Sequence, residues 1–287
     1  MTYSPKYSIR GIFINNKNWE RYKSSHSELD SNVIREVERM LDCCNPDKGY
    51  FRGYCEHCRK EVIMHFRCNG RICNRCGRSY VDKWMKKEKK KIFKERHRLV
   101  TLTVPAALRQ ILHNRWDLLK ILQDSANEAI KKTIQKDVNK KVEIGVLIGL
   151  QTFGQDAKFH PHPHCLVLDK ARWKKGFVNI YRLQFDSLRK IWQEVLITNL
   201  CEARISDEEK KLVKSMKEKY KSGFVVDPGR STLNWIGVVK YLARYMMRHP
   251  PIANSRIIFY RRGRVTIRMR DKQRREYSIW MTVFLFF

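Results

Sequence analysis

The chain has 287 residues, 43% of them hydrophobic, which is enough for a folded core and suggests about two domains. Sixty Lys and Arg against 29 Asp and Glu leave a net charge of +31, more than solubility requires, so we expect a polyanion as partner along an extended surface. No stretch reaches the ~20 apolar residues of a membrane span, and the first ten residues lack the apolar core of a signal peptide. We therefore expect no membrane partner and a cytoplasmic location.

Residues 1–30 are polar and weakly patterned, and we expect them to form a loose N-terminal arm. From Ser31, apolar residues recur at the spacing of an amphipathic helix, with Asp30 or Ser31 as its cap. This helix leads into a cysteine-rich segment, and residues 31–96 together are predicted to form a zinc-binding module.

Seven of the nine cysteines lie between Cys43 and Cys76. The strongest pattern among them is a pair of Cys-x-x-Cys motifs, Cys55 with Cys58 and Cys73 with Cys76. Each motif can place two thiolates in one tight turn, so the two motifs together predict a tetrahedral structural zinc site. A second site could be completed from Cys43, Cys44 and Cys68 with His57 and His65, and free buried thiols are the alternative for these residues.

A basic run at Lys86–Lys91 follows, which suits either a solvated helix face or phosphate contact. Residues 97–105 alternate as a strand and open a second predicted domain, at 97–270. A long helical region is expected over 106–138. Later in the chain we predict a short strand at 175–180, helices near 185–196 and 206–221, and a hairpin formed by 256–260 and 265–269.

Three histidines alternate with prolines in the stretch Phe159-His-Pro-His-Pro-His-Cys165, which runs into an apolar strand. Because side chains of a strand alternate between faces, His162 and His164 point the same way, close enough to share one cation. The apolar run at 142–150 and the turn residues after it predict a hairpin with this strand. Gln151 would then lie opposite His162 as a third ligand, and Gln155 or Asp156 are alternatives.

The segment 234–248 predicts an amphipathic helix that carries Tyr241 and Tyr245 one turn apart. Lys240, Arg244 and Arg248 flank the two phenols. Such a pair could offer oxygen nucleophiles to a phosphodiester whose charge the cations offset. Tyrosines at this spacing are also common at the edge of a core.

In this order, the cysteine module, the His-x-His strand and the Tyr-x-x-x-Tyr helix resemble the rolling-circle insertion-sequence transposases. These form the two-tyrosine branch of the HUH endonucleases, which also include plasmid replication initiators and relaxases. The resemblance covers about residues 33–270 and includes the local sequences Leu150-Gln-Thr-Phe-Gly154 and Tyr241-Leu-Ala-Arg-Tyr245. It implies an α+β fold, with a small N-terminal zinc-binding module followed by an HUH-type antiparallel sheet flanked by helices.

The resemblance also implies a chemistry. His162 and His164 would hold Mg or Mn, and Tyr241 or Tyr245 would attack single-stranded DNA to leave a 5′-phosphotyrosine and a free 3′-hydroxyl. The second tyrosine would serve strand transfer, in a bacterial or archaeal cell. Zinc would be structural, held by cysteines drawn from Cys43, Cys55, Cys58, Cys68, Cys73 and Cys76. The number of zinc ions and the oligomeric state are left open.

Two features depart from the family pattern. Pro163 stands between the histidines, where the family usually has a bulky apolar residue, and residues 271–287 turn abruptly from basic to apolar. A frameshift or a premature stop would produce such an aberrant tail, and a chain ending at Asp271 would then be expected to nick DNA as the full chain does. The rival functions are a non-catalytic zinc-containing DNA-binding remnant of a transposase, and a replication initiator or relaxase.

Overall fold

The computed structural model describes residues 7–70, 72–154, 158–180, 183–246, 253–270 and 275–282. Its helices and antiparallel sheets confirm the α+β fold class. The chain divides into two compact units, which are described separately. The first contains the described residues up to Trp84 and those from Ala253 on, and the second contains Met85–Gly154 and Lys158–Met246. None of the described helices is both long and apolar enough to cross a membrane.

Three helices begin the first unit, α1 (Ile9–Ile14), α2 (Asn18–Ser25) and α3 (Ser31–Leu41). The side chain of Asp30 caps α3, as one of the two predicted caps. The expectation of a loose arm over residues 1–30 is wrong for the described part, because Ile9, Ile12 and Trp19 are buried in a core. The helices are short and their apolar residues few, which explains why the periodicity was weak.

Residues close to the end of the chain complete this core. Strands β8 (Ile257–Arg261), β9 (Arg264–Arg270) and β10 (Glu276–Thr282) form a sheet with β9 in the middle. Val265 and Ile267 of β9 are buried in the same cluster as the N-terminal helices. Part of the expected aberrant tail is therefore a paired strand, while residues 271–274 and 283–287 lie outside the described chain.

A hairpin and a helix carry the cysteines. The hairpin consists of β1 (Tyr50–Cys55) and β2 (Lys60–His65), and its sheet contains no other strand among the described residues. Helix α4 (Cys76–Glu88) begins at a cysteine and runs into the second unit. Short 3-10 turns at Asn15–Lys17, Pro46–Lys48 and Asn254–Arg256 join the other elements of the first unit.

The second unit is built on an antiparallel sheet in the order β4-β5-β3-β7, with β6 beside β5. Its strands are β3 (His97–Leu102), β4 (Glu143–Phe153), β5 (Phe159–Trp173), β6 (Gly176–Asn179) and β7 (Val226–Thr232). The predicted hairpin is present, and Gln151 pairs with His162 as expected from its turn residues. Pro161 and Pro163 lie in the first five residues of β5, where the register gives this strand partners in β4 alone, since its pairing with β3 begins at His164.

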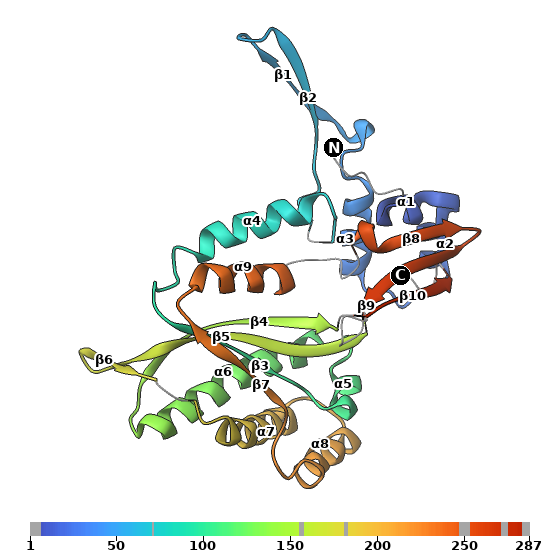
Figure 1. The fold of residues 1–287 in the computed structure, drawn as a ribbon. Coiled ribbons are helices and arrows are strands. Elements are labelled where there is room, and N and C mark those ends of the chain that lie inside the picture. The colour runs from blue at the N-terminus through green and yellow to red at the C-terminus, as the bar shows by residue number, and fades with distance from the viewer. Residues whose placement is uncertain are drawn as a thin grey trace. The chain divides into compact units, whose positions relative to one another are not determined.

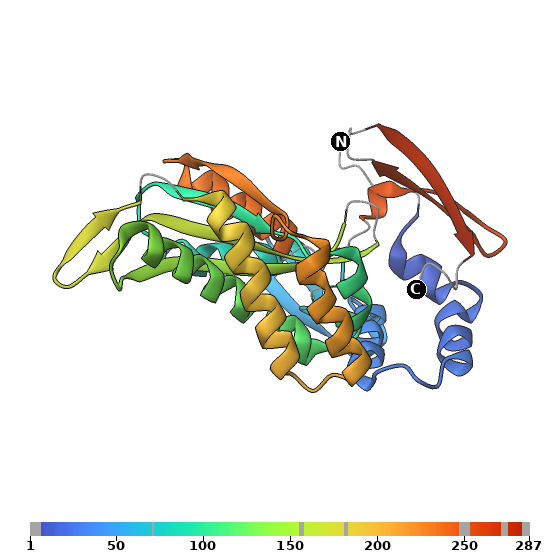
Figure 2. The ribbon, with the colours of Figure 1, turned by 90° about the horizontal axis from the view of Figure 1, so that it is seen from below.

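Helices cover both faces of this sheet. Helices α5 (Ala106–Leu112), α6 (Trp116–Val138), α7 (Phe185–Glu202) and α8 (Asp207–Lys219) lie on one face, and α9 (Trp235–Met246) lies on the other (Figures 1 and 2). The core between the sheet and the first group includes Val100, Cys165, Leu122 and Trp192. Since β5 alternates, Cys165 and Val167 face this core while His162, His164 and Leu166 face α9.

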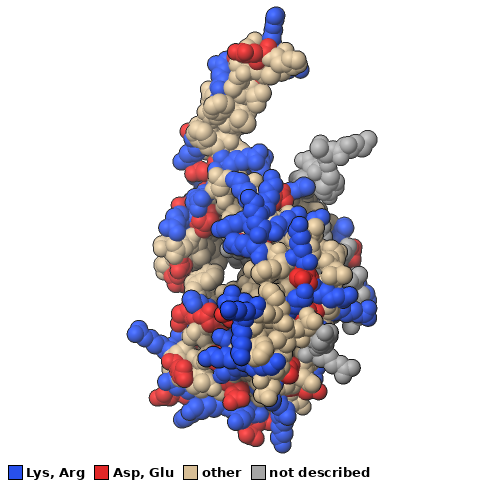
Figure 3. All heavy atoms as spheres, turned by 90° about the vertical axis from the view of Figure 1, so that its left-hand side faces the viewer, with Lys and Arg blue, Asp and Glu red and all other residues tan. Residues whose placement is uncertain are grey.

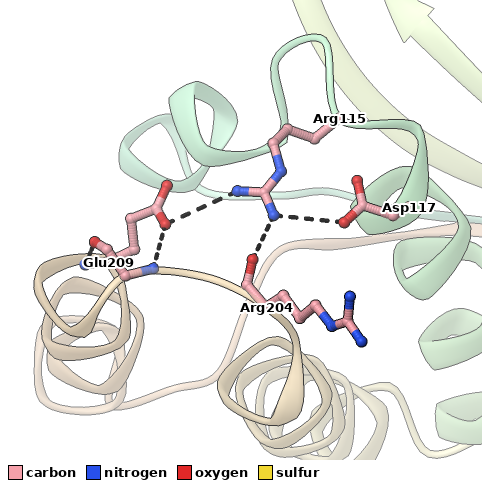
Figure 4. Close-up of polar contacts among 5 residues, drawn as sticks. Arg115, Asp117, Arg204 and Glu209 are labelled. Atoms are coloured by element: carbon pink, nitrogen blue, oxygen red, sulfur yellow. Dashed lines mark hydrogen bonds and ion pairs between the residues drawn. The ribbon is translucent and has the colours of Figure 1, made fainter.

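Polar contacts fix the end of the helical layer. Arg115, just before α6, donates a hydrogen bond of 2.6 Å to the carbonyl of Arg204 and lies 3.9 Å from the carboxylate of Glu209 (Figure 4). Glu209 also accepts from the backbone N–H of Ser206 and completes a capping box at the start of α8. The loops before α6 and α8 are thereby tied together, which holds the layer behind the sheet in place.

Candidate metal centres and catalytic face

Four cysteines of the first unit converge on one point. The sulfur atoms of Cys43, Cys68, Cys73 and Cys76 lie within 4.8 Å of one another, and the sulfurs of Cys43 and Cys76 are 3.5 Å apart. Cys43, Cys73 and Cys76 are buried. They come from the end of α3, the segment after β2 and the start of α4, so the site joins three parts of the chain.

The donor set fits zinc. Zinc with four thiolates is tetrahedral, with Zn–S distances of about 2.3 Å, and places sulfurs close together as they are here. Burial raises the pKa of Cys76 to about 11 and raises that of Cys68 as well, so these groups would stay neutral thiols without a cation. The four cysteines would hold the ion and close the first unit around it.

The structure corrects the expected pairing of the two Cys-x-x-Cys motifs. Cys73 and Cys76 belong to the four-cysteine cluster, whereas Cys55 and Cys58 lie at the far end of the β1–β2 hairpin and are outside it. Cys43 and Cys68, which were assigned to a possible second site, complete the first one instead. The reason is topological: the hairpin carries the 55–58 turn away from the point at which Cys73 and Cys76 meet α3.

The remaining candidates for a second site are Cys44, His57 and His65. The structure does not bring any of them into the cluster. His65 pairs with Tyr50 at the base of the hairpin and contacts its ring, while His57 lies in the turn at the other end. The described part of the chain therefore holds no cluster that unites these three residues.

In the second unit, the predicted histidine strand forms a compact polar group on the α9 face. The imidazole rings of His162 and His164 have centroids 4.8 Å apart. Nε2 of His164 lies 3.0 Å from Oε1 of Gln151, and the amide of Gln151 donates to the carbonyl of Phe153 at 2.9 Å. The two imidazoles and the amide oxygen thus form one set of three donors for a cation.

Hydrogen bonds set the orientation of both rings. Nδ1 of His162 lies 2.5 Å from the carbonyl of His160, so this nitrogen carries the proton and Nε2 keeps its lone pair. Nδ1 of His164 lies 3.1 Å from the hydroxyl of Thr101. A hydroxyl can donate or accept, so Thr101 suits either tautomer of His164, including the one that frees Nε2 for a metal.

The surroundings favour the neutral, ligating form of both histidines. Burial, with a smaller contribution from the nearby His162, lowers the pKa of His164 to about 4. Burial likewise lowers the pKa of His162, and the positive charge of Arg109 adds to that shift. The site therefore fits a divalent cation at neutral pH in its donor types and in their protonation.

The predicted tyrosine helix lies against this group. The ring of Tyr241 packs edge-on to His164 with centroids 6.2 Å apart, and the residue is 37% exposed. Val239 and Ala243 anchor α9 through buried side chains, and Lys240 is exposed. Tyr241 is thus partly open to solvent beside the His pair.

Not every predicted residue can be placed. Tyr245 and Arg244 belong to α9, but their side chains are not described. Arg248, and the alternative ligands Gln155 and Asp156, lie outside the described residues. The structure therefore gives the position of one of the two predicted nucleophiles.

Sequence reasoning missed two residues that act on the histidines. Thr101 comes from β3 and Arg109 from α5, both more than fifty residues before the histidines. The alternation of residues 99–104 placed Thr101 on one side of a strand, but nothing in the sequence paired that strand with β5. Arg109 is one basic residue among sixty, and only the fold brings it near His162.

Comparison with known proteins finds one family match over each of the two groups of residues described above. Residues 14–104 match the family described as "Transposase zinc-binding domain", and residues 145–283 match the family described as "Putative transposase". The first match contains the four-cysteine cluster. The second contains Gln151, the two histidines and α9.

Two curated relatives match over most of the chain. The "Putative transposase y4qJ" of Sinorhizobium fredii is 24% identical over 92% of this chain and 71% of its own length. The "Transposase for insertion sequence element IS801" of Pseudomonas savastanoi pv. phaseolicola is 22% identical over 91% of this chain and 66% of its own length. No solved structure matches the chain.

Proposed function

Because the chain belongs to the rolling-circle insertion-sequence transposases, we propose that it cuts and rejoins single-stranded DNA through a 5′-phosphotyrosine. The observation that carries the proposal is the contact between Tyr241 and His164, which puts a phenol next to a three-donor cation site. A phenol on a solvent-accessible helix face can reach a DNA backbone that is unpaired. The catalytic residues and the single-stranded substrate belong to the proposal.

The chemical step is a transesterification. The phenol oxygen of Tyr241 forms a bond to phosphorus, the bond from phosphorus to the 3′ oxygen breaks, and the phenol proton is lost as the leaving oxygen gains one. A Mg or Mn ion, when bound by His162, His164 and Gln151, supplies Lewis-acid polarisation of the phosphate. Because the phosphotyrosine keeps the energy of the broken bond, a new 3′-hydroxyl can displace it without ATP.

Other residues support this step by position and charge. Arg109 near His162, and Lys240 beside Tyr241, would offset charge on the phosphate. Tyr245, one turn further along α9, is the proposed second nucleophile for strand transfer. Lys and Arg cover much of the surface seen in Figure 3, as expected of a chain that follows a DNA backbone.

The test uses single-stranded DNA with the ends of the element, labelled at either its 5′ or its 3′ side, with Mn or with a chelator. We expect a denaturant-resistant adduct that carries the 3′-labelled fragment, because that fragment retains the 5′-phosphate. It should require the metal. It should be lost in a Tyr241→Phe, Tyr245→Phe double variant and in His164→Ala, and the single tyrosine variants then assign the two roles.

The matched control is Tyr220→Phe, which alters a tyrosine of the same unit that packs on Phe224 away from the His pair. It should form the adduct as the unaltered chain does. If DNA is bound but no adduct forms with any metal, the proposal fails and a zinc-containing DNA-binding protein is the better description. An adduct that persists in the double variant would also overturn it.

A further inference from the structure

The β1–β2 hairpin carries two cysteines that the four-cysteine zinc site does not use. Cys55 ends β1 and Cys58 lies in the turn of residues 56–59 that leads into β2. Arg59 closes this turn with a φ of 53°. The N–H groups of Cys58 and His57 point at the sulfur of Cys55 and lower its pKa, so the two thiols lie in one tight turn.

This pair offers two of the four ligands that a structural zinc ion takes. Structural zinc takes four ligands, usually cysteine or histidine. Among the described residues, the Cys43 cluster is the only group of three or more metal-ligating side chains that comes together, so no third ligand reaches Cys55 and Cys58. A zinc ion bound to this pair would take its other ligands from outside the described residues, and an identical turn of a second molecule offers two thiols.

The hairpin face next to this half site is apolar and uncovered. The register of the strands puts Phe51, Val62 and Met64 on the same face as Cys55. Their exposed fractions are 56%, 48% and 54%, although the ring of Phe51 lies over Gly53. A lone two-stranded ribbon with this much exposed apolar surface is marginally stable in water, so such a face indicates a contact site.

The charge of the hairpin argues for a protein partner. Residues 50–66 contain three Lys or Arg and two Asp or Glu, a net charge of +1 in a chain of +31. Arg52 and Glu61 pair at 2.6 Å on the other face, which neutralises them locally. Most of the hairpin is uncharged where it projects from the top of Figure 3. A surface made for a phosphate backbone would instead concentrate positive charge.

We propose that the hairpins of two copies of this chain meet and share one zinc ion, held by Cys55 and Cys58 of each copy. A two-fold axis through the ion makes the contact isologous, so the apolar face of one hairpin covers the same face of the other. The four thiols release their protons on binding, and the site then carries a charge of −2. Arg59 and Lys60 of each copy, next to the ligands, offset that charge.

The experiment compares the full chain with a Cys55→Ser, Cys58→Ser double variant, in zinc and reductant, by sedimentation velocity and metal analysis. The full chain should be a dimer and the variant a monomer with about half a zinc ion per chain less, because one four-ligand site serves two chains. Cys201→Ser, which alters a cysteine of α7, is the control and should remain a dimer. The adduct assay is not needed, so this test can fail independently of the proposed catalysis.

Several outcomes would overturn the inference. One is that the full chain and the double variant have the same sedimenting mass and the same zinc content. Another is that the double variant is still a dimer. A third is that the double variant loses a whole zinc ion per chain while its sedimenting mass stays the same. A dimer that forms only when reductant is left out, and that resists chelator, would be a disulfide and would also contradict the proposal. With the unaltered chain, graded chelation should dissociate the dimer before the buried cluster loses its zinc, and the opposite order would contradict the proposal.

Discussion

Each of the three donors of the candidate cation site, His162, His164 and Gln151, is oriented by a second contact. The carbonyl of His160 holds His162, the carbonyl of Phe153 holds Gln151, and the hydroxyl of Thr101 holds His164. A ligand that is held in place loses less freedom on binding a metal, and such outer contacts commonly affect metal affinity or activity by about 10–100-fold. A substitution of one outer contact therefore tests the candidate cation site without removing a ligand.

Thr101→Val should weaken the metal site without removing a ligand. The valine keeps the shape of the threonine but cannot hydrogen-bond to Nδ1 of His164, so the ring loses its orientation. We expect the Mn concentration for half-maximal nicking to rise by about 10–100-fold. Titration of nicking with Mn, together with DNA binding measured in chelator, would separate this effect from loss of DNA affinity.

The matched control is Thr103→Val, two residues further along. Thr103 uses its backbone in its described contacts, donating to Val225 and accepting from Trp192. Its substitution should leave the Mn titration unchanged. If Thr101→Val behaves like this control, Thr101 does not orient His164.

His97 gives the second unit a dependence on pH. It is buried at the start of β3, where Nδ1 donates to the carbonyl of Glu95 at 2.8 Å, and burial lowers its pKa below the ordinary 6.5. The unfolded chain therefore binds this proton more readily than the folded one. The contribution of neutral, buried His97 to the free energy of unfolding is complete above pH 6.5 and is lost as the pH falls through the folded-state pKa. Between the two pKa values, the free energy of unfolding falls by at most about 1.4 kcal/mol per pH unit.

His97→Gln should reduce the slope of unfolding free energy against pH below 6.5. Urea unfolding at several pH values would measure it. The slope should not vanish, because burial also lowers the pKa values of His162 and His164. His113→Gln, at an exposed position, should keep the original slope, and an unchanged slope in His97→Gln would show that His97 does not contribute.

The pairing of the edge strand β7 with β3 depends on one glycine, Gly229. A Cβ on Gly229 would lie 2.0 Å from the carbonyl oxygen of Leu99, an atom of the neighbouring strand that cannot swing away as a side chain would. Gly229→Ala should therefore shift β7 and destabilise the second unit by about 1–3 kcal/mol, as overpacking does. Urea unfolding followed by circular dichroism would measure the loss.

Gly176→Ala is the corresponding control. Gly176 lies in β6 of the same sheet, and a Cβ there meets no atom within 4 Å. We expect no more than a small change in stability. Equal effects of the two substitutions would mean that the glycine requirement comes from general strand properties and not from the contact with Leu99.

Local patterns predicted the elements that carry the candidate cation site and Tyr241. The turn residues near Asp156 set the register that pairs Gln151 with His162, because a hairpin between neighbouring strands needs only local information. The helix of Tyr241 followed from the amphipathic spacing of its own residues. Its packing against His164, more than seventy residues earlier, had no local signal and was suggested only by family resemblance.

The cysteines show the opposite case. Spacing alone joined Cys55 and Cys58 to Cys73 and Cys76, since both pairs have the same motif. The structure separates the two pairs, because the β1–β2 hairpin carries Cys55 and Cys58 at its turn, away from the cluster that contains Cys73 and Cys76. The short N-terminal helices escaped prediction for a related reason: their burial depends on β8 and β9, which lie more than two hundred residues later.

The two units have separate cores, and only the core of the first unit contains the cysteines of the candidate zinc site. The core of the first unit includes Cys43, Cys73 and Cys76 together with residues of α1, α3 and β9. The core of the second is made of aliphatic and aromatic residues from the sheet and α5 to α8, and its one fully buried cysteine, Cys165, belongs to no metal cluster among the described residues. Zinc should therefore stabilise one unit only.

Removal of zinc by a strong chelator should unfold the first unit and spare the second. Without the ion, the four thiols remain in the core without the bonds that join α3 to α4, and structural zinc sites contribute about 10–16 kcal/mol of binding free energy in small domains. Hydrogen exchange read by mass spectrometry follows each unit separately. Amides of α1, α3 and β9 should lose protection on chelation, while those of α6 and β5 should keep it.

Two variants distinguish the ion from a general effect of the chelator. Cys73→Ser removes one ligand of the cluster and should reproduce the exchange pattern of chelation, whereas Cys201→Ser changes a cysteine of α7 in the second unit and should not. Returning zinc should restore protection in the unaltered chain. Loss of protection in α6 and β5 together with α3 would show that the two cores unfold as one, and unchanged exchange in α3 would show that the cluster does not support the fold.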